Sequence, residues 1–86
     1  MKVCSTYTAV MVYPRWGPDW RTTVDSLADI GELNLAVFVD KNIFTQHLLV
    51  FEVMGKPDDI HWFRSKMHAE DRRHRFRIYE SWRDHD

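Results

Sequence analysis

Cysteine, glycine and proline are scarce in this sequence, and each scarcity excludes a class of protein. The 86 residues include one cysteine, Cys4, so the chain cannot be a small scaffold held together by internal disulfides. With three glycines and three prolines, it holds no low-complexity linker. No apolar run approaches the length of a membrane-spanning helix. We therefore expect a soluble, cytoplasmic protein that folds as one domain over residues 1–86.

The sequence also lacks an excess of charge of either sign. Its 12 Lys and Arg residues are matched by 13 Asp and Glu residues, which leaves a formal net charge of −1 at pH 7. A dedicated nucleic-acid-binding domain usually has a strongly basic surface, so we expect no nucleic-acid partner. The start of the chain lacks the apolar core of a signal peptide, and we expect no membrane partner.

Aromatic residues are abundant instead. They make up 14% of the chain and include four tryptophans, Trp16, Trp20, Trp62 and Trp82. In so short a chain this surplus can complete a hydrophobic core, line a pocket or contact another subunit.

Apolar periodicity predicts four strands and two helices. The apolar run within residues 44–54 is long enough to be a strand buried on both faces. Residues 3–13 carry no charge on either alternate set and predict a second central strand. In chain order the expected elements are strand 3–13, helix 18–30, strand 33–40, strand 44–54, helix 57–71 and strand 74–82.

Glycine and proline mark the expected ends of the helices. Pro18 and Pro57 suit first-turn positions, and Gly31 is the expected stop of the first helix. Cys4 is expected as a small core residue. The polar tail 83–86 is expected to fray.

The order of these elements predicts an α+β fold of the ferredoxin-like type, β-α-β-β-α-β. Two right-handed crossovers bring the four strands into one antiparallel sheet with both helices on one face. The expected strand order is 4-1-3-2. This order places strands 3–13 and 44–54 at the centre, and these are the two strands that lack a polar face.

The helices can cover only one face of this sheet. The covered face is expected to take Val10, Val12, Leu35, Val37, Val39, Leu49, Phe51, Val53, Phe76 and Ile78. The open face is then expected to take Tyr7, Met11, Phe38, Leu48, Val50 and Tyr79, together with Glu52, Arg75 and Arg77. Alternation alone does not decide which set of residues in the first and last strands lies on the covered face and which on the open face. In either case an apolar face in water favours aggregation, so we expect a second copy to pack on it as a two-fold dimer, with a covering loop or tail as the alternative.

This pattern resembles the dimeric ferredoxin-like α+β barrels, a group that includes antibiotic-biosynthesis monooxygenases, muconolactone isomerases and stress-responsive barrel proteins. The resemblance covers nearly the whole chain. It lies in the element order and the two-sided sheet, and no local motif accompanies it. It implies a homodimer with a ligand pocket between helices and sheet or inside the barrel, and it carries no catalytic residue with it.

We therefore expect a small, mainly apolar ligand in an aromatic-lined cavity, without a cofactor. The expected ligand contacts are Tyr7, Met11, Trp20, Phe38, Glu52, Trp62 and Arg77. Glu52 interrupts an apolar strand, and a buried carboxylate there is suited to proton abstraction, although an ion pair with an arginine is the alternative. Two other functions stay open: a cofactor-independent monooxygenase or isomerase that uses the same cavity, and a protein–protein interaction module without a ligand.

Two weaker patterns do not change this prediction. The histidines His61, His68 and His74 lack the spacing of metal ligands, so no metal site is expected. A basic band surrounds the end of the second helix, but the exposed aromatic residues of an RNA-binding sheet are missing. The band consists of Arg64, Lys66, Arg72, Arg73, Arg75 and Arg77.

Overall fold

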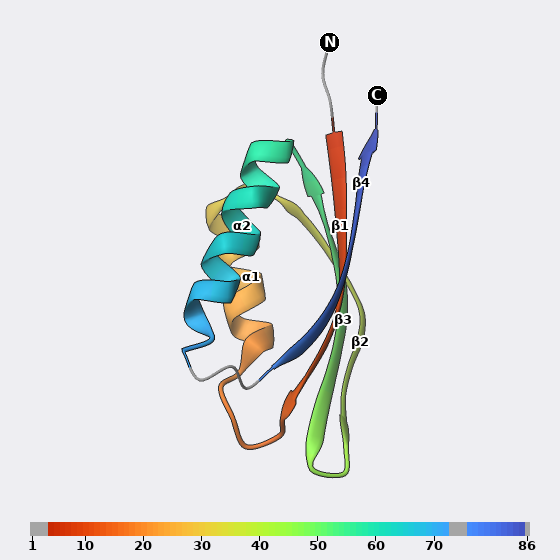
Figure 1. Cartoon of the computed structure of the whole chain (residues 1–86), viewed down its shortest axis with the longest axis vertical. Helices are drawn as coiled ribbons and strands as arrows, with labels where there is room; N and C mark the ends of the chain where they lie inside the picture. The colour runs from red at the N-terminus through yellow and green to blue at the C-terminus, as the bar shows by residue number, and fades with distance from the viewer. Residues whose placement is uncertain (1–3, 73–75, 86) are drawn as a thin grey trace.

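Two helices pack on one face of a four-stranded sheet (Figure 1). The computed structural model describes residues 4–72 and 76–85. The elements are β1 (Cys4–Pro14), α1 (Trp20–Ile30), β2 (Asn34–Ile43), β3 (Gln46–Gly55), α2 (Pro57–Glu70) and β4 (Arg77–His85). The strand order is β2-β3-β1-β4 and every strand pair is antiparallel. The predicted ferredoxin-like fold and its two central strands are therefore confirmed.

The hydrophobic core lies between the helices and the sheet. Its buried members are Tyr7, Ala9, Met11, Tyr13, Trp20, Val24, Ala28, Leu33, Leu49, Phe51, Val53, Ile60, Phe63, Met67 and Phe76. Within the described residues no helix is both long and apolar enough to cross a lipid bilayer.

The helices cover the face of β1 that holds Tyr7 and Met11, so the two faces predicted for this strand are exchanged. Tyr7 pairs with Val53 across β3, and residues opposite each other in an antiparallel pair share a face. Val10 and Val12 lie on the open face instead. Both alternate sets of β1 are uncharged, so alternation could not choose between them. The register against β3 makes the choice.

A bulge in β2 makes a second predicted face assignment wrong, that of Val39. Val37 pairs with Phe51 and Val39 pairs with Val50, so two steps along β2 match one step along β3. Phe38 is the extra residue of this β-bulge. Val39, which was expected on the covered face, therefore lies on the open face.

Gly31 ends α1 as predicted, but the reason is packing. Its φ is −81°, which any residue adopts, whereas the positive φ of 54° falls on Glu32. A Cβ atom at Gly31 would lie 2.9 Å from Cζ3 of Trp62. The glycine therefore lets α2 approach the end of α1. Pro18 lies before the helix and not in its first turn, because Asp19 is the N-cap.

Most of the predicted frayed tail is part of the sheet, and residue 86 lies outside the described residues. Residues 83–85 belong to β4 and pair with the start of β1. The hydroxyl groups of Ser5 and Thr6 form hydrogen bonds with the side chains of Asp84 and His85. These polar cross-strand bonds extend β4 beyond its apolar part. The sequence of this extension has no apolar periodicity that would predict a strand.

The two ends of this strand pair differ from expectation in other ways. Cys4, expected in the core, is exposed as the first residue of β1. The strand predicted from residue 74 begins at Arg77. Residues 74 and 75 lie outside the described residues, and so does Arg73.

The hairpin between β2 and β3 contains local backbone strain. Phe44 has a φ of 54°, a left-handed conformation that is costly for a bulky side chain, and it is 90% exposed. Phe44→Gly should raise the free energy of unfolding by about 0.5–1 kcal/mol, because glycine adopts this conformation without strain. Urea denaturation of both proteins measures the difference. Phe44→Ala is the control: it removes the same ring but keeps a Cβ, so an equal gain from alanine would contradict the strain argument.

Candidate functional site

The predicted ligand contacts do not meet at one place in the fold. Tyr7 and Met11 are buried in the core beneath the helices. Phe38 lies at the β2 bulge and is exposed. Glu52 and Arg77 lie on the open face, where Glu52 pairs with Thr8 and Arg77 with Val12.

The two tryptophans expected to form the roof of a cavity lie at opposite ends of α1. Trp20 is the first residue of α1, whereas Trp62 contacts Gly31 just after its last residue. Between them the core is filled, because Phe51, Phe63 and other large side chains are fully buried. Of these predicted contacts, Trp20 lines a pocket of the described structure.

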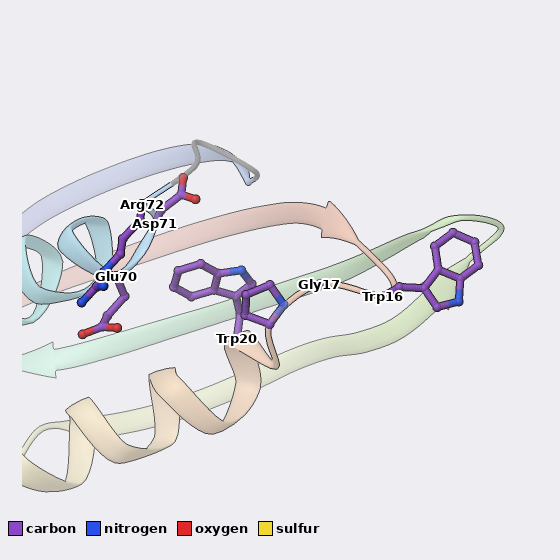
Figure 2. A pocket seen from close by; sticks show the side chains of 7 residues that line it. Trp16, Gly17, Trp20, Glu70, Asp71 and Arg72 are labelled. Atoms are coloured by element: carbon purple, nitrogen blue, oxygen red, sulfur yellow. The ribbon is translucent and has the colours of Figure 1, made fainter.

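This pocket, the tryptophan pocket, lies where the loop between β1 and α1 meets the end of α2. Both segments lie in the half of the molecule away from the two termini (Figure 1). The volume is about 340 Å³. The lining residues are Trp16, Gly17, Pro18, Trp20, Glu70, Asp71 and Arg72. In Figure 2 the indole of Trp20 lies between Gly17 of the loop and the end of α2.

The loop wall of the tryptophan pocket is fixed by backbone hydrogen bonds. The Gly17 N–H donates to the Pro14 carbonyl over 2.9 Å, which closes a turn. The Arg15 N–H donates to the Thr45 carbonyl over 3.0 Å and ties the loop to the β2–β3 hairpin. With prolines on both sides of the turn, this wall is largely preformed.

The inner wall of the pocket is the side chain of Trp20. Trp20 is 2% exposed and packs edge-on against Phe76, with ring centroids 4.8 Å apart. Its Nε1–H has no hydrogen-bond partner, and it is the one buried side-chain nitrogen or oxygen in that condition within residues 4–72 and 76–85. An unsatisfied buried donor costs about 1–3 kcal/mol. The wall therefore contains a donor without an acceptor.

The rim of the pocket combines an exposed aromatic ring with charges of both signs. Trp16 is 76% exposed and points away from Trp20, with the Arg15 guanidinium 5.9 Å from its ring centroid (Figure 2). On the other side, Glu70 and Asp71 contribute two carboxylates and Arg72 one guanidinium. Among the described residues the rim therefore carries charges of both signs.

A second, polar pocket of about 240 Å³ lies against the same loop. Its lining residues are Tyr13, Arg15, Gly17, Pro18, Asp19, Arg21, Asp40 and His47. Asp40 accepts hydrogen bonds from Arg21, over 3.0 Å, and from the His47 ring. Burial, with the nearby carboxylates of Asp40 and Asp19, raises the pKa of Tyr13 to about 12. Its charged side chains already bind one another, the Thr22 hydroxyl or the backbone, so this pocket offers little free charge to a ligand.

A cluster around Glu80 joins α2 to β4. The Glu80 carboxylate accepts hydrogen bonds from the Tyr7 hydroxyl (2.6 Å), the His68 ring (2.7 Å) and the Arg64 guanidinium (2.9 Å). Burial raises the pKa of Glu80, but the bonds from Arg64, Tyr7 and His68 outweigh burial and lower it to about 2. Burial and Glu80 raise the pKa of Tyr7. The groups are bound to one another, so the cluster serves as a structural link.

The histidines are used in side-chain packing. His61 stacks on Trp82 with ring centroids 4.5 Å apart, and His68 contacts Glu80. His74 lies outside the described residues. Within the described part of the chain no group of three or more His, Cys, Asp or Glu side chains is placed to hold a metal ion.

The open face has an apolar half. Val39, Val50, Val10 and Tyr79 form one row across the four strands. Leu48 and Val12 continue the apolar surface in the next row. Tyr79 is 72% exposed, and the valines are partly exposed. The Glu52 side chain, in the neighbouring row, has no hydrogen bond or ion pair to another described residue.

Sequence reasoning missed the tryptophan pocket and the Glu80 cluster. The pocket had a local signal, because Trp16 lies among Pro14, Gly17 and Pro18 in a loop that offers it little cover. The cluster had none, because its members come from β1, α2 and β4 and meet only in the folded chain.

Comparison with known proteins supports the fold alone. No protein-family model matches the chain, and no curated protein matches it. A de novo designed protein, Foldit4, is similar in structure with a TM-score of 0.66 and 9% identity, over 96% of this chain and 97% of that one. CPII, a nitrogen regulatory PII-like protein from Thiomonas intermedia K12, has a TM-score of 0.64 and 6% identity in its apo form, over 98% and 95%. Formyltetrahydrofolate deformylase from Burkholderia mallei has a TM-score of 0.59 and 18% identity, over 94% of this chain and 28% of that enzyme. At such identities these likenesses show a ferredoxin-like fold and carry no activity with them.

Proposed function

We propose that this chain is a homodimeric binding protein that holds a small, mainly apolar ligand in the tryptophan pocket. The observation that carries the proposal is the unpartnered indole N–H of Trp20 in the wall of an open, aromatic-lined pocket. The volume of about 340 Å³ lies within the range of ligand sites, which are typically 300–1,000 Å³. The preformed loop wall keeps the entropy cost of binding low.

A binding function fits the pocket better than the alternative of a monooxygenase or isomerase. Proton abstraction needs a base held next to the substrate in a dry environment. The carboxylates of the pocket, Glu70 and Asp71, lie at its rim. Glu80, which is held by three partners, and Glu52, on the open face, both lie outside it.

Ligand binding should stabilise the protein and change its tryptophan emission. At a free ligand concentration 100 times Kd, the free energy of unfolding should rise by about 2.7 kcal/mol. A panel of small aromatics, quinones and fatty acids, tested by thermal shift and fluorescence, measures both effects. AMP and ADP belong in the panel because CPII from Thiomonas intermedia K12 was solved with both.

Tryptophan variants locate the response. Trp16→Phe and Trp20→Phe should each reduce the change in emission, because Trp20 forms the inner wall of the pocket and Trp16 lies at its rim. Trp62→Phe is the control, because Trp62 packs at the other end of α1. A response that only Trp62→Phe removes would contradict the proposed site. If no compound gives a response, a protein–protein interaction module without a small ligand becomes the leading functional hypothesis.

The open face supports the homodimer as a second part of the function. An apolar row that crosses all four strands is the kind of surface that a second copy covers by sheet-to-sheet packing. Glu52 and Arg77, expected as ligand contacts, then become part of this dimer surface.

A further inference from the structure

We infer that the two copies of the homodimer pack sheet to sheet with the two-fold axis across the strands, along the apolar row, so that Glu52 of each copy binds Lys41 of the other. This inference rests on the homodimer proposed above, because it names the arrangement of the same dimer surface and the ion pair that selects it. It is carried by the placement of opposite charges on the two sides of the apolar row.

The charged side chains next to the apolar row lie in the two rows that flank it. Glu52 of β3 lies in the row on one side, and the other members of that row are Ala36, Thr8 and Ser81. Lys41 of β2 and Arg77 of β4 lie at the two ends of the row on the other side, which Leu48 and Val12 complete. None of the three charged groups forms a hydrogen bond or ion pair with another described residue. All three are therefore available to a partner.

The shape of the apolar row favours two aligned sheets. The row crosses all four strands, so a second copy covers its whole length only where the same row of that copy faces it. In an aligned sandwich the strand directions of the two sheets stay within about 30° of each other, which keeps the two rows close together. In an orthogonal packing the rows would cross at one point and leave Tyr79, at the β4 end, in water.

Two-fold symmetry allows two aligned arrangements, and charge disfavours the one with the axis along the strands. In that arrangement each row faces itself with its ends exchanged. Lys41 of one copy then lies opposite Arg77 of the other, and symmetry repeats this contact. Like charges that face each other across an interface oppose association.

The arrangement with the axis across the strands brings opposite charges together. The apolar row again faces itself, but the two flanking rows exchange, so the Glu52 row of one copy faces the Lys41 row of the other. Glu52 then lies opposite Leu48, and Lys41 is on the neighbouring strand, about 4.8 Å to the side. Packed sheets are about 10 Å apart, a gap that extended glutamate and lysine side chains span together. Each dimer contains two such ion pairs.

Charge reversal of the full chain tests the ion pair. Glu52→Lys and Lys41→Glu should each raise the dimer dissociation constant about 10–100-fold, because each change makes two like-charge contacts. The double variant restores opposite charges, so its dissociation constant should return to within about threefold of the unmodified value. Analytical ultracentrifugation over a concentration series measures all four proteins.

Lys41→Glu also distinguishes the two arrangements, because they predict changes of opposite sign. With the axis along the strands, the new carboxylate would lie opposite Arg77 and tighten the dimer. Lys66→Glu is the control, since Lys66 is exposed on α2 and the same change in net charge there should leave the dissociation constant unchanged. Circular dichroism checks that each variant is folded. If Glu52→Lys does not fold, the direction of the change in Lys41→Glu decides.

The outcomes separate this inference from the homodimer on which it rests. A dimer that Lys41→Glu tightens or leaves unchanged overturns the ion pair and keeps the homodimer. A double variant that is no tighter than the single variants also overturns the pair. An unmodified chain that stays monomeric at high concentration overturns the homodimer, and this inference with it.

Discussion

Glu80→Ala should lower the free energy of unfolding by about 2–4 kcal/mol, a large share of the stability of so small a chain. The substitution leaves the hydroxyl of Tyr7, which is buried in the core, without its 2.6 Å acceptor. It also removes the partner that holds Arg64 and His68 of α2 against β4. Urea denaturation measures the loss, and the midpoint of thermal unfolding should fall by roughly 10–20 °C.

Two further variants show which part of the Glu80 cluster carries this stability. Glu80→Gln keeps an acceptor for Tyr7 and should cost less than alanine. In the Glu80→Ala background, Tyr7→Phe should cost little or even stabilise, because it removes the donor that the first change left unpaired. A loss below about 0.5 kcal/mol for Glu80→Ala would show that the cluster is no more than a surface ion pair.

The pH dependence of stability provides an independent check on Glu80. Its pKa is about 2 in the folded chain against an ordinary value of 4.5. Because the folded pKa is the lower one, the unfolded chain takes up the proton first as the pH falls. The contribution of Glu80 is therefore present above pH 4.5 and is lost between about 4.5 and 2. Glu80→Ala should weaken this part of the acid transition.

Val50→Lys should convert the proposed homodimer into a monomer. Val50 lies in the middle of the apolar row, between Val39 of β2 and Val10 of β1. In a sheet-to-sheet dimer the lysine would be a buried charge without a partner, and two-fold symmetry introduces it twice. The dimer dissociation constant should rise at least about 100-fold. Sedimentation at micromolar concentration measures the mass, with a reductant present because Cys4 is exposed.

The control for Val50→Lys adds the same charge elsewhere. Ser26 is exposed on α1, in the helical layer away from the open face, so Ser26→Lys should leave the dimer intact. Phe38→Asp, at the bulge, tests the edge of the same surface. An unmodified chain that stays soluble and monomeric at high concentration would contradict the homodimer, and so would a Val50→Lys variant that keeps the full dimer mass.

The sequence predicted those features of the fold that produce a periodic pattern of apolar residues, and it did not predict the others. The order of the elements and the two central strands followed from the uncharged residues of 3–13 and the apolar run in 44–54. The face of β1 did not follow, because both of its alternate sets are uncharged. The bulge at Phe38 was also invisible, because an extra residue leaves the alternation of Val37 and Val39 unchanged in the sequence.

The candidate site was less predictable than the fold. Trp20 was expected to contact a ligand because of its type, but its partners were expected across the core. They are instead the turn at Gly17 and Pro18 and the end of α2. A cavity between the helices and the sheet forms only where side chains leave space unfilled. Composition does not show how completely Phe51 and Phe63 fill that space.

The sequence alone therefore determined the class of fold, the order of its strands and the presence of an apolar face that two helices cannot cover. These depend on periodicity and on the handedness of crossovers, which are local or general properties of chains. Only the tertiary structure decided that the indole N–H of Trp20 lacks a partner and that Glu80 links Tyr7 to α2. Both depend on the meeting of side chains from separate elements within about 3 Å, a distance that only the packed fold sets.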